Sequence, residues 1–116
     1  RLKKRMSVGD ADAFSYLGEI NSAGKYGIPQ NKGKAFELWA KSAELGSVKG
    51  HFNLALAYYN GDGVGTDLVQ AKYHYELAAI GGNDNARYNI GIIEYKSNNF
   101  DRAKKHWMIA AMRGHD

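Results

Sequence analysis

The apolar residues of this 116-residue chain recur in stripes with helical spacing. In the most regular stripe, an alanine is followed by an aromatic residue four positions later and by a second alanine eight positions later. The stripe occurs three times, as Ala35, Trp39 and Ala43, as Ala71, Tyr75 and Ala79, and as Ala103, Trp107 and Ala111. Residues four and eight apart lie on one face of an α-helix. Each stripe therefore predicts a helix with one buried face.

A second kind of stripe precedes each of the first. It consists of a small residue, Leu or Ile four positions later, and another small residue directly after that. The three sets are Ala13, Leu17 and Gly18; Gly50, Leu54 and Ala55; and Ala86, Ile90 and Gly91. All variation in length falls between the two stripes, as expected where a loop absorbs insertions. Each repeated unit is therefore predicted to be a helix, a loop and a second helix.

Polar residues and glycines mark the predicted helix ends. Asn31, Asp67 and Asn99 each lie four positions before a second stripe, where a side-chain oxygen can accept a hydrogen bond from a free backbone N–H. Glycines at 9, 46, 82 and 114 close the units, and glycine readily takes the left-handed conformation that ends a helix. One helix pair cannot bury its apolar face alone, so the units should stack into a solenoid.

On this basis we divide the chain into three units, residues 9–46, residues 47–82 and a shortened unit of residues 83–114. Residues 1–8 then correspond to the tail of a preceding second helix, and residues 115–116 to the start of a next unit. We therefore expect the array to be cut at both ends and to be part of a longer chain or larger assembly.

These columns resemble the Sel1-like repeat (SLR) family, a relative of the tetratricopeptide repeats. The match is best over residues 47–82, which include Gly61-Asp62-Gly63-Val64 between the stripes. Asn21 and Glu94 depart from the family, which usually has an aromatic residue there, and residues 96–99 replace the glycine loop in the third unit. We expect looser packing around Asn21 and a tight turn at 96–99. The resemblance implies an all-α fold, a right-handed α-α superhelix of helix-loop-helix repeats, that serves as an interaction scaffold without chemistry of its own.

The composition excludes several kinds of site. With no Cys, the chain has no disulfide, thiol nucleophile or Cys-based metal centre. Its formal charge of +4 is accounted for by Arg1-Leu2-Lys3-Lys4-Arg5, which is weak support for a nucleic-acid surface. No apolar run approaches the roughly 20 residues that span a bilayer. We expect neither nucleic-acid binding nor membrane insertion. The compartment stays open, and a soluble cytoplasmic chain is the preferred interpretation.

Three motifs could carry chemistry, but each has a simpler structural explanation. The glycine-rich segment 61–65 lacks the preceding strand of a phosphate-binding loop. His74 and His106 share a column on helices predicted to be neighbours, but two imidazoles are too few for a closed metal site. Residues 46–50 place Ser47 one position too early for a nucleophile elbow. We therefore predict no catalytic residue, no metal site and no cofactor.

The first helices carry a stripe on the side opposite their buried face. In the tetratricopeptide class, the corresponding stripe lines a concave groove. It is polar in the first unit and apolar or aromatic in the next two, where asparagines lie beside it. The candidate partner-binding residues are Phe52, Asn53, Leu56, Tyr59, Tyr88, Asn89, Ile92 and Tyr95. Large exposed apolar patches often mark binding sites. Alternatively, these side chains are used to stack neighbouring first helices, and the sequence leaves both possibilities open.

The sequence thus predicts a non-catalytic scaffold or adaptor that binds a protein or peptide partner on the concave first-helix face. The asparagines could pair with the backbone of a bound segment, and the aromatic residues would supply contact area. A carbohydrate-recognising module is the alternative, because exposed aromatic rings also stack on sugars. A purely structural spacer is a further possibility, whereas an enzyme is disfavoured.

Overall fold

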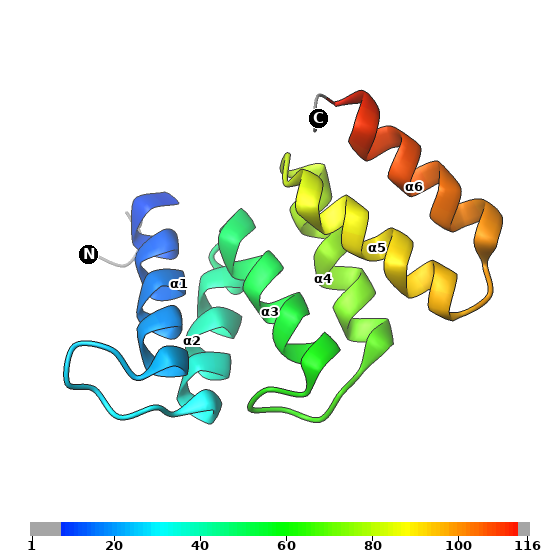
Figure 1. Ribbon diagram of the computed structural model, residues 1–116. Helices are drawn as coiled ribbons and strands as arrows, with labels where there is room; N and C mark the ends of the chain where they lie inside the picture. The colour runs from blue at the N-terminus through cyan, green and yellow to red at the C-terminus, as the bar shows by residue number, and fades with distance from the viewer. Residues whose placement is uncertain (1–7, 114–116) are drawn as a thin grey trace.

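The computed structural model describes residues 8–113, and this part of the chain forms six helices and no strand. The helices alternate with short connections in the predicted helix-loop-helix order (Figure 1). Their bounds are α1 Val8–Ala23, α2 Lys32–Glu44, α3 Val48–Asn60, α4 Leu68–Ile80, α5 Asp84–Lys96 and α6 Phe100–Met112. The predicted helix tail in 1–8 falls almost wholly outside the described residues, as do residues 115–116. An all-α repeat solenoid is confirmed.

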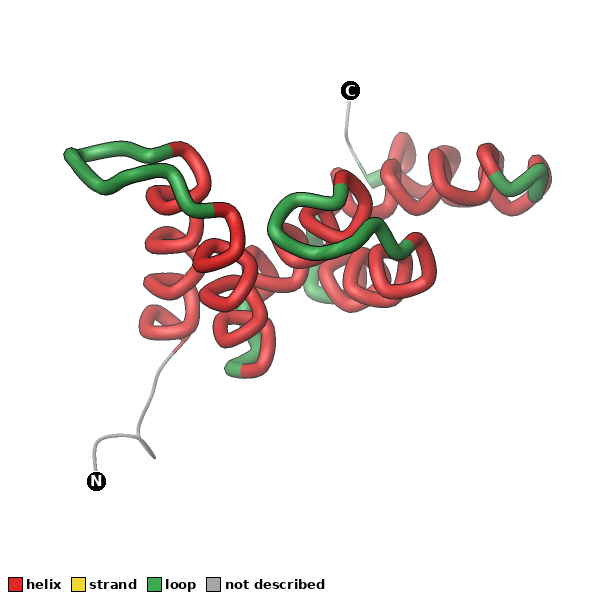
Figure 2. The backbone as a smooth tube through the Cα atoms, turned by 90° about the horizontal axis from the view of Figure 1, so that it is seen from below, coloured by secondary structure: helices red, strands yellow, loops and turns green. Residues whose placement is uncertain are grey.

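The molecule is elongated, with extents of 45 × 29 × 24 Å. Each helix packs mainly on its neighbours in sequence, and α1 also contacts α3. The loops that join α1 to α2 and α3 to α4 lie at the same edge (Figure 2). The first helices α1, α3 and α5 therefore form one layer, and the second helices α2, α4 and α6 form the other.

Each helix pair is held together by an aromatic ring packed on a small residue. The indole of Trp39 lies against Gly18 and donates a hydrogen bond from Nε1 to the backbone oxygen of Ser15 at 3.1 Å. The third unit repeats this arrangement with Trp107 and Gly91. In the second unit, Tyr75 and Ala55 occupy the same columns, and both are buried. The small residues predicted from the sequence thus make room for the rings.

The helix ends follow the predicted polar residues with one exception. Asn31 and Asp67 accept hydrogen bonds from backbone N–H groups in the first turns of α2 and α4. Asn99 makes no such bond at α6. Its amide nitrogen instead donates to the Glu94 carboxylate at 2.8 Å. The tight turn predicted for residues 96–99 is confirmed, and Asn98 adopts a left-handed φ of 66° within it.

Three expectations about the first unit are wrong. Helix α1 begins at Val8 and so contains Gly9, where the sequence predicted a helix end. Leu17 is 42% exposed, because its column packs on the second helix of the preceding unit and residues 8–113 hold no such helix before α1. Asn21 is buried rather than loosely packed, and its side chain donates a hydrogen bond to the Leu17 carbonyl at 2.9 Å.

Candidate functional site

Between α1 and α3, the predicted groove stripe is used for stacking. Asn53 of α3 donates hydrogen bonds to Ser15 Oγ at 2.8 Å and to Glu19 Oε2 at 3.1 Å. Ser47, at the start of α3, donates from Oγ to Asp12 Oδ1 at 2.6 Å. Small polar side chains let these two helices approach closely. The amide nitrogen of Asn53 is therefore already engaged within the chain.

Between α3 and α5, the same columns form an open cleft. Apolar side chains replace polar ones here, since Leu56 and Ile92 occupy the column that holds Glu19 in α1. The two helices make no extensive backbone approach like that of α1 and α3. The resulting space, which we call the α3–α5 cleft, has a volume of about 110 Å³ and is lined by Leu56, Tyr59, Asn60, Tyr75, Asn89 and Ile92.

The floor of the α3–α5 cleft is formed by Tyr75 of α4, which is only 1% exposed. Burial raises the pKa of its phenol to about 12, while a hydrogen bond with the Asn89 side chain acts in the opposite direction. Asn89 therefore contacts Tyr75 much as Asn53 contacts Ser15. The cleft keeps a neutral, hydrogen-bonded floor between two aliphatic walls.

A positive charge lies at the edge of the α3–α5 cleft. The ammonium of Lys96, in the last turn of α5, donates a hydrogen bond to the Tyr59 hydroxyl at 2.6 Å. The same nitrogen lies 5.1 Å from the centre of the Tyr59 ring. Sequence analysis missed Lys96 because it lies one position outside the stripe, next to Tyr95. The sequence offered one signal for Lys96, which is that it directly follows a residue of the stripe, in the last turn of the helix.

The remaining predicted site residues divide between packing and exposure. Phe52 is half-buried and packs on Tyr75, with ring centres 5.6 Å apart. Tyr88 and Tyr95 both contact Trp107, at 6.2 and 6.0 Å between ring centres, yet each stays about half exposed. Tyr88 and Trp107 also line a second hollow of about 250 Å³ between α5 and α6. Stacking and an open groove therefore both occur, at different positions.

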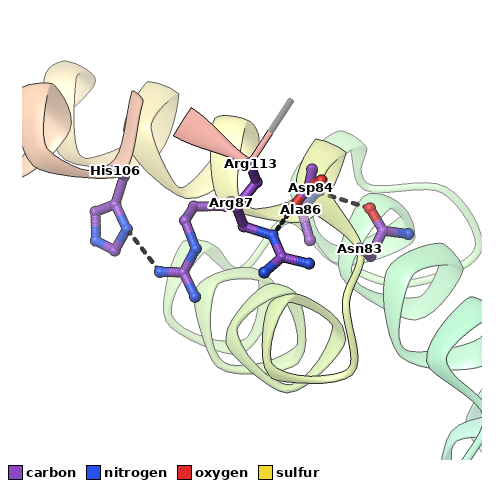
Figure 3. A network of polar contacts seen from close by, with 6 residues as sticks. All are labelled: Asn83, Asp84, Ala86, Arg87, His106 and Arg113. Atoms are coloured by element: carbon purple, nitrogen blue, oxygen red, sulfur yellow. Dashed lines mark hydrogen bonds and ion pairs between the residues drawn. The ribbon is translucent and has the colours of Figure 1, made fainter. Parts of the chain in front are cut away.

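The two histidines predicted to be neighbours each pair with a different first-helix residue. His74 Nδ1 lies 3.0 Å from His51 Nδ1 of α3. His106 Nδ1 lies 3.4 Å from Arg87 Nη1 of α5, as Figure 3 shows. Burial and the nearby His51 lower the pKa of His74 to about 4. Burial, and then the Arg87 charge, lower the pKa of His106. At neutral pH both imidazoles are therefore uncharged.

Neither histidine pair belongs to a larger cluster of ligands. Within residues 8–113, no group of three or more His, Asp or Glu side chains is placed to hold a metal ion. The glycine-rich loop packs on the start of α2, where a side chain at Gly63 would overlap the Lys32 backbone and where Asp62 lies 3.8 Å from the Lys32 ammonium. None of the helices in this range is both long and apolar enough to cross a membrane.

A model of the Sel1 repeat matches the chain three times, at residues 11–47, 48–83 and 86–115. The chain belongs to the Sel1 repeat family. Sel1 repeats are typically non-catalytic modules that mediate protein–protein interaction. Two of the crystal structures that share the fold are the following. A Sel1 repeat protein from Oxalobacter formigenes is 27% identical with a TM-score of 0.80, over 92% of this chain and 44% of that one. The protective antigen c5321 of uropathogenic Escherichia coli is 26% identical with a TM-score of 0.82, over 97% and 24%.

Curated relatives of this Sel1 repeat chain include proteins of Schizosaccharomyces pombe and Saccharomyces cerevisiae. Chitin synthase regulatory factor 4 of Schizosaccharomyces pombe is 29% identical over 113 residues, which are 97% of this chain. Protein SHC1 of Saccharomyces cerevisiae is 31% identical over 94 residues, or 81% of this chain. The chain spans about a fifth of the length of these relatives, 18% in each case.

Proposed function

We propose that this Sel1 repeat chain is a non-catalytic scaffold that binds a partner polypeptide at the α3–α5 cleft. The observation that carries the proposal is the difference between the two seams of the first-helix layer, a seam being the line along which two neighbouring first helices meet. Polar side chains close the α1–α3 seam, whereas the α3–α5 seam keeps an apolar hollow on a buried aromatic floor. A preformed apolar hollow loses little conformational entropy when a ligand enters it.

The comparisons support an adaptor rather than an enzyme. The relative from Schizosaccharomyces pombe is named a regulatory factor of chitin synthase, a name that describes action on another protein. Within residues 8–113, Glu94 is the one buried charged residue, and it forms an ion pair with Lys72 of α4 at 2.7 Å. The proposed role therefore requires surface and shape, not a reactive group.

A selection from a random peptide library displayed on phage tests the proposal. The immobilised full chain is compared with Leu56→Asn, which places an amide in the wall of the cleft. Leu68→Asn is the matched control, because Leu68 of α4 is also 38% exposed and lies outside the cleft. We expect wild type and Leu68→Asn to enrich the same peptides and Leu56→Asn to lose at least tenfold in affinity, about 1.4 kcal/mol.

Several outcomes would count against the proposal. Equal binding by Leu56→Asn would remove the cleft from the binding site. Absence of any enriched peptide would contradict peptide binding by this face and favour a structural spacer. Release of the selected peptides by free oligosaccharides would favour the carbohydrate-recognising alternative.

A further inference from the structure

We infer that the α3–α5 cleft recognises an aliphatic side chain next to an acidic residue of the partner, with Lys96 pairing with the acidic side chain. The inference rests on the proposed function and specifies the chemistry of the partner. It draws on three independent features of the cleft, namely its size, its apolar walls and the charge at its edge.

The size of the cleft favours an aliphatic over an aromatic anchor. An apolar cavity of about 150 Å³ in a protein holds one benzene molecule. The α3–α5 cleft has only about 110 Å³, which is too small to enclose an aromatic ring but sufficient for the branched end of Leu, Ile or Val. Its two walls, Leu56 and Ile92, are themselves aliphatic, so an aliphatic side chain would bury apolar surface on both sides.

The charge at the edge of the cleft favours an acidic neighbour of that anchor. Lys96 makes no ion pair with any carboxylate among residues 8–113, and within that range its ammonium contacts Tyr59. An ammonium group has three donors, and the Tyr59 hydroxyl accepts from one of them, so two are available to a carboxylate. Because Tyr59 also lines the cleft, its hydrogen bond with Lys96 keeps the ammonium beside the cleft.

Lys96 is therefore a specificity element rather than the main source of affinity. It is exposed, and charge pairs at an exposed rim contribute modestly to affinity while they orient and select the partner. A partner segment with an aliphatic residue and Asp or Glu within two positions would satisfy both parts at once. An aliphatic segment flanked by Lys or Arg would be rejected by charge repulsion.

The test compares the composition of peptides selected from the same random library by three proteins. Lys96→Gln removes the charge but keeps a similar length of side chain. Lys49→Gln is the matched control, because Lys49 is an exposed lysine of α3 outside the cleft. We expect wild type and Lys49→Gln to enrich an aliphatic residue with Asp or Glu nearby, and Lys96→Gln to keep the aliphatic residue and lose the acidic preference.

Affinities of one selected peptide provide the quantitative test. Lys96→Gln should weaken binding of the acidic peptide about threefold to fivefold, the upper part of the range for an exposed ion pair. It should leave binding of the Gln-substituted version of the peptide unchanged. An acidic preference that survives in Lys96→Gln, or enrichment of Trp and Tyr anchors, would overturn the inference while leaving the proposed function intact. Loss of all enrichment, or enrichment insensitive to Leu56→Asn, would overturn both.

Discussion

Gly18 provides a sharp test of how the helix pairs of this protein are packed. A methyl group at Gly18 would lie 2.6 Å from Cδ1 and 2.9 Å from Cε2 of the Trp39 indole. Both distances are well below van der Waals contact. Because Trp39 is only 8% exposed, its ring has little room to move aside. The substitution Gly18→Ala should therefore force α1 and α2 apart.

The expected magnitude is a balance of opposing effects. Overpacking of a buried site costs about 1–3 kcal/mol. A shift of the indole would also weaken its hydrogen bond to the Ser15 carbonyl, worth about 1 kcal/mol. Replacing glycine by alanine inside a helix stabilises by about 1 kcal/mol. We expect a net destabilisation of about 2 kcal/mol.

Urea unfolding followed by far-UV circular dichroism measures this change. With a slope of about 2 kcal/mol per molar urea, typical of small proteins, the midpoint should fall by about 1 M. Gly33→Ala in α2 is the control, because a methyl group there meets only Asn31 Oδ1 at 3.6 Å. It should be neutral or slightly stabilising. Gly91→Ala should cost less than Gly18→Ala, because Trp107 is only half-buried and borders an open hollow.

The second unit suggests a rescue, since it combines Ala55 with the smaller ring of Tyr75 in the same columns. The double variant Gly18→Ala/Trp39→Tyr should therefore recover part of the lost stability. A Gly18→Ala protein as stable as wild type would refute the close packing of Trp39 on α1. It would also show that Gly18 is not required for the helix approach.

Three further predictions concern other contacts. The pKa of His74 is about 4 in the folded protein, against 6.5 for an ordinary histidine. Below pH 6.5 the unfolded chain therefore binds a proton that the folded protein does not, and the free energy of unfolding should fall as the pH drops from about 6.5 to 4. After allowance for solvent screening we expect a loss of about 1–2 kcal/mol. Urea midpoints at neutral and acidic pH should show this loss, and an equal loss in His74→Gln would contradict it. Lys72→Met should destabilise by about 1–3 kcal/mol, less than the loss of a fully buried pair, because Lys72 is one-third exposed and the buried Glu94 carboxylate keeps the Asn99 amide and the Arg102 charge nearby. Lys72→Met/Glu94→Gln should recover most of that loss, and no recovery in thermal unfolding would argue for a packing role of the lysine stem. Asn98→Ala should cost about 1 kcal/mol because the residue has a left-handed φ of 66°, whereas Asn98→Gly should be close to neutral, and equal melting temperatures for both variants would contradict the strain.

Much of the fold follows from local patterns along the chain. The alanine and aromatic stripes predict the second helices, because helical spacing requires only the 3.6-residue period. Asn31 and Asp67 cap helices through contacts within four residues. Asn99 was predicted to do the same, but its amide is drawn to the buried carboxylate of Glu94. Glu94 lies only five positions before Asn99, but its burial and its ion pair with Lys72 of α4 come from tertiary packing, which no local pattern reveals.

The candidate site was only partly predictable for the same reason. Sequence columns placed Leu56, Tyr59 and Ile92 on one face, and they line the cleft. They could not show that the Asn53 side chain is hydrogen-bonded to Ser15 of α1, or that the Lys96 ammonium lies over the Tyr59 ring. These contacts join residues more than thirty positions apart in sequence.

Local sequence was thus sufficient for the helices, for most of their ends, for the small residues beneath the aromatic rings and for the three-unit solenoid. Each of these depends on spacing within one or two turns or on repetition of the same spacing. Tertiary structure decided which seam of the first-helix layer closes and which stays open. That outcome depends on how far neighbouring helices approach each other. The distance between two neighbouring helices is set jointly by the side chains of both helices and of the helix beneath them, so it cannot be predicted from the pattern of any single helix.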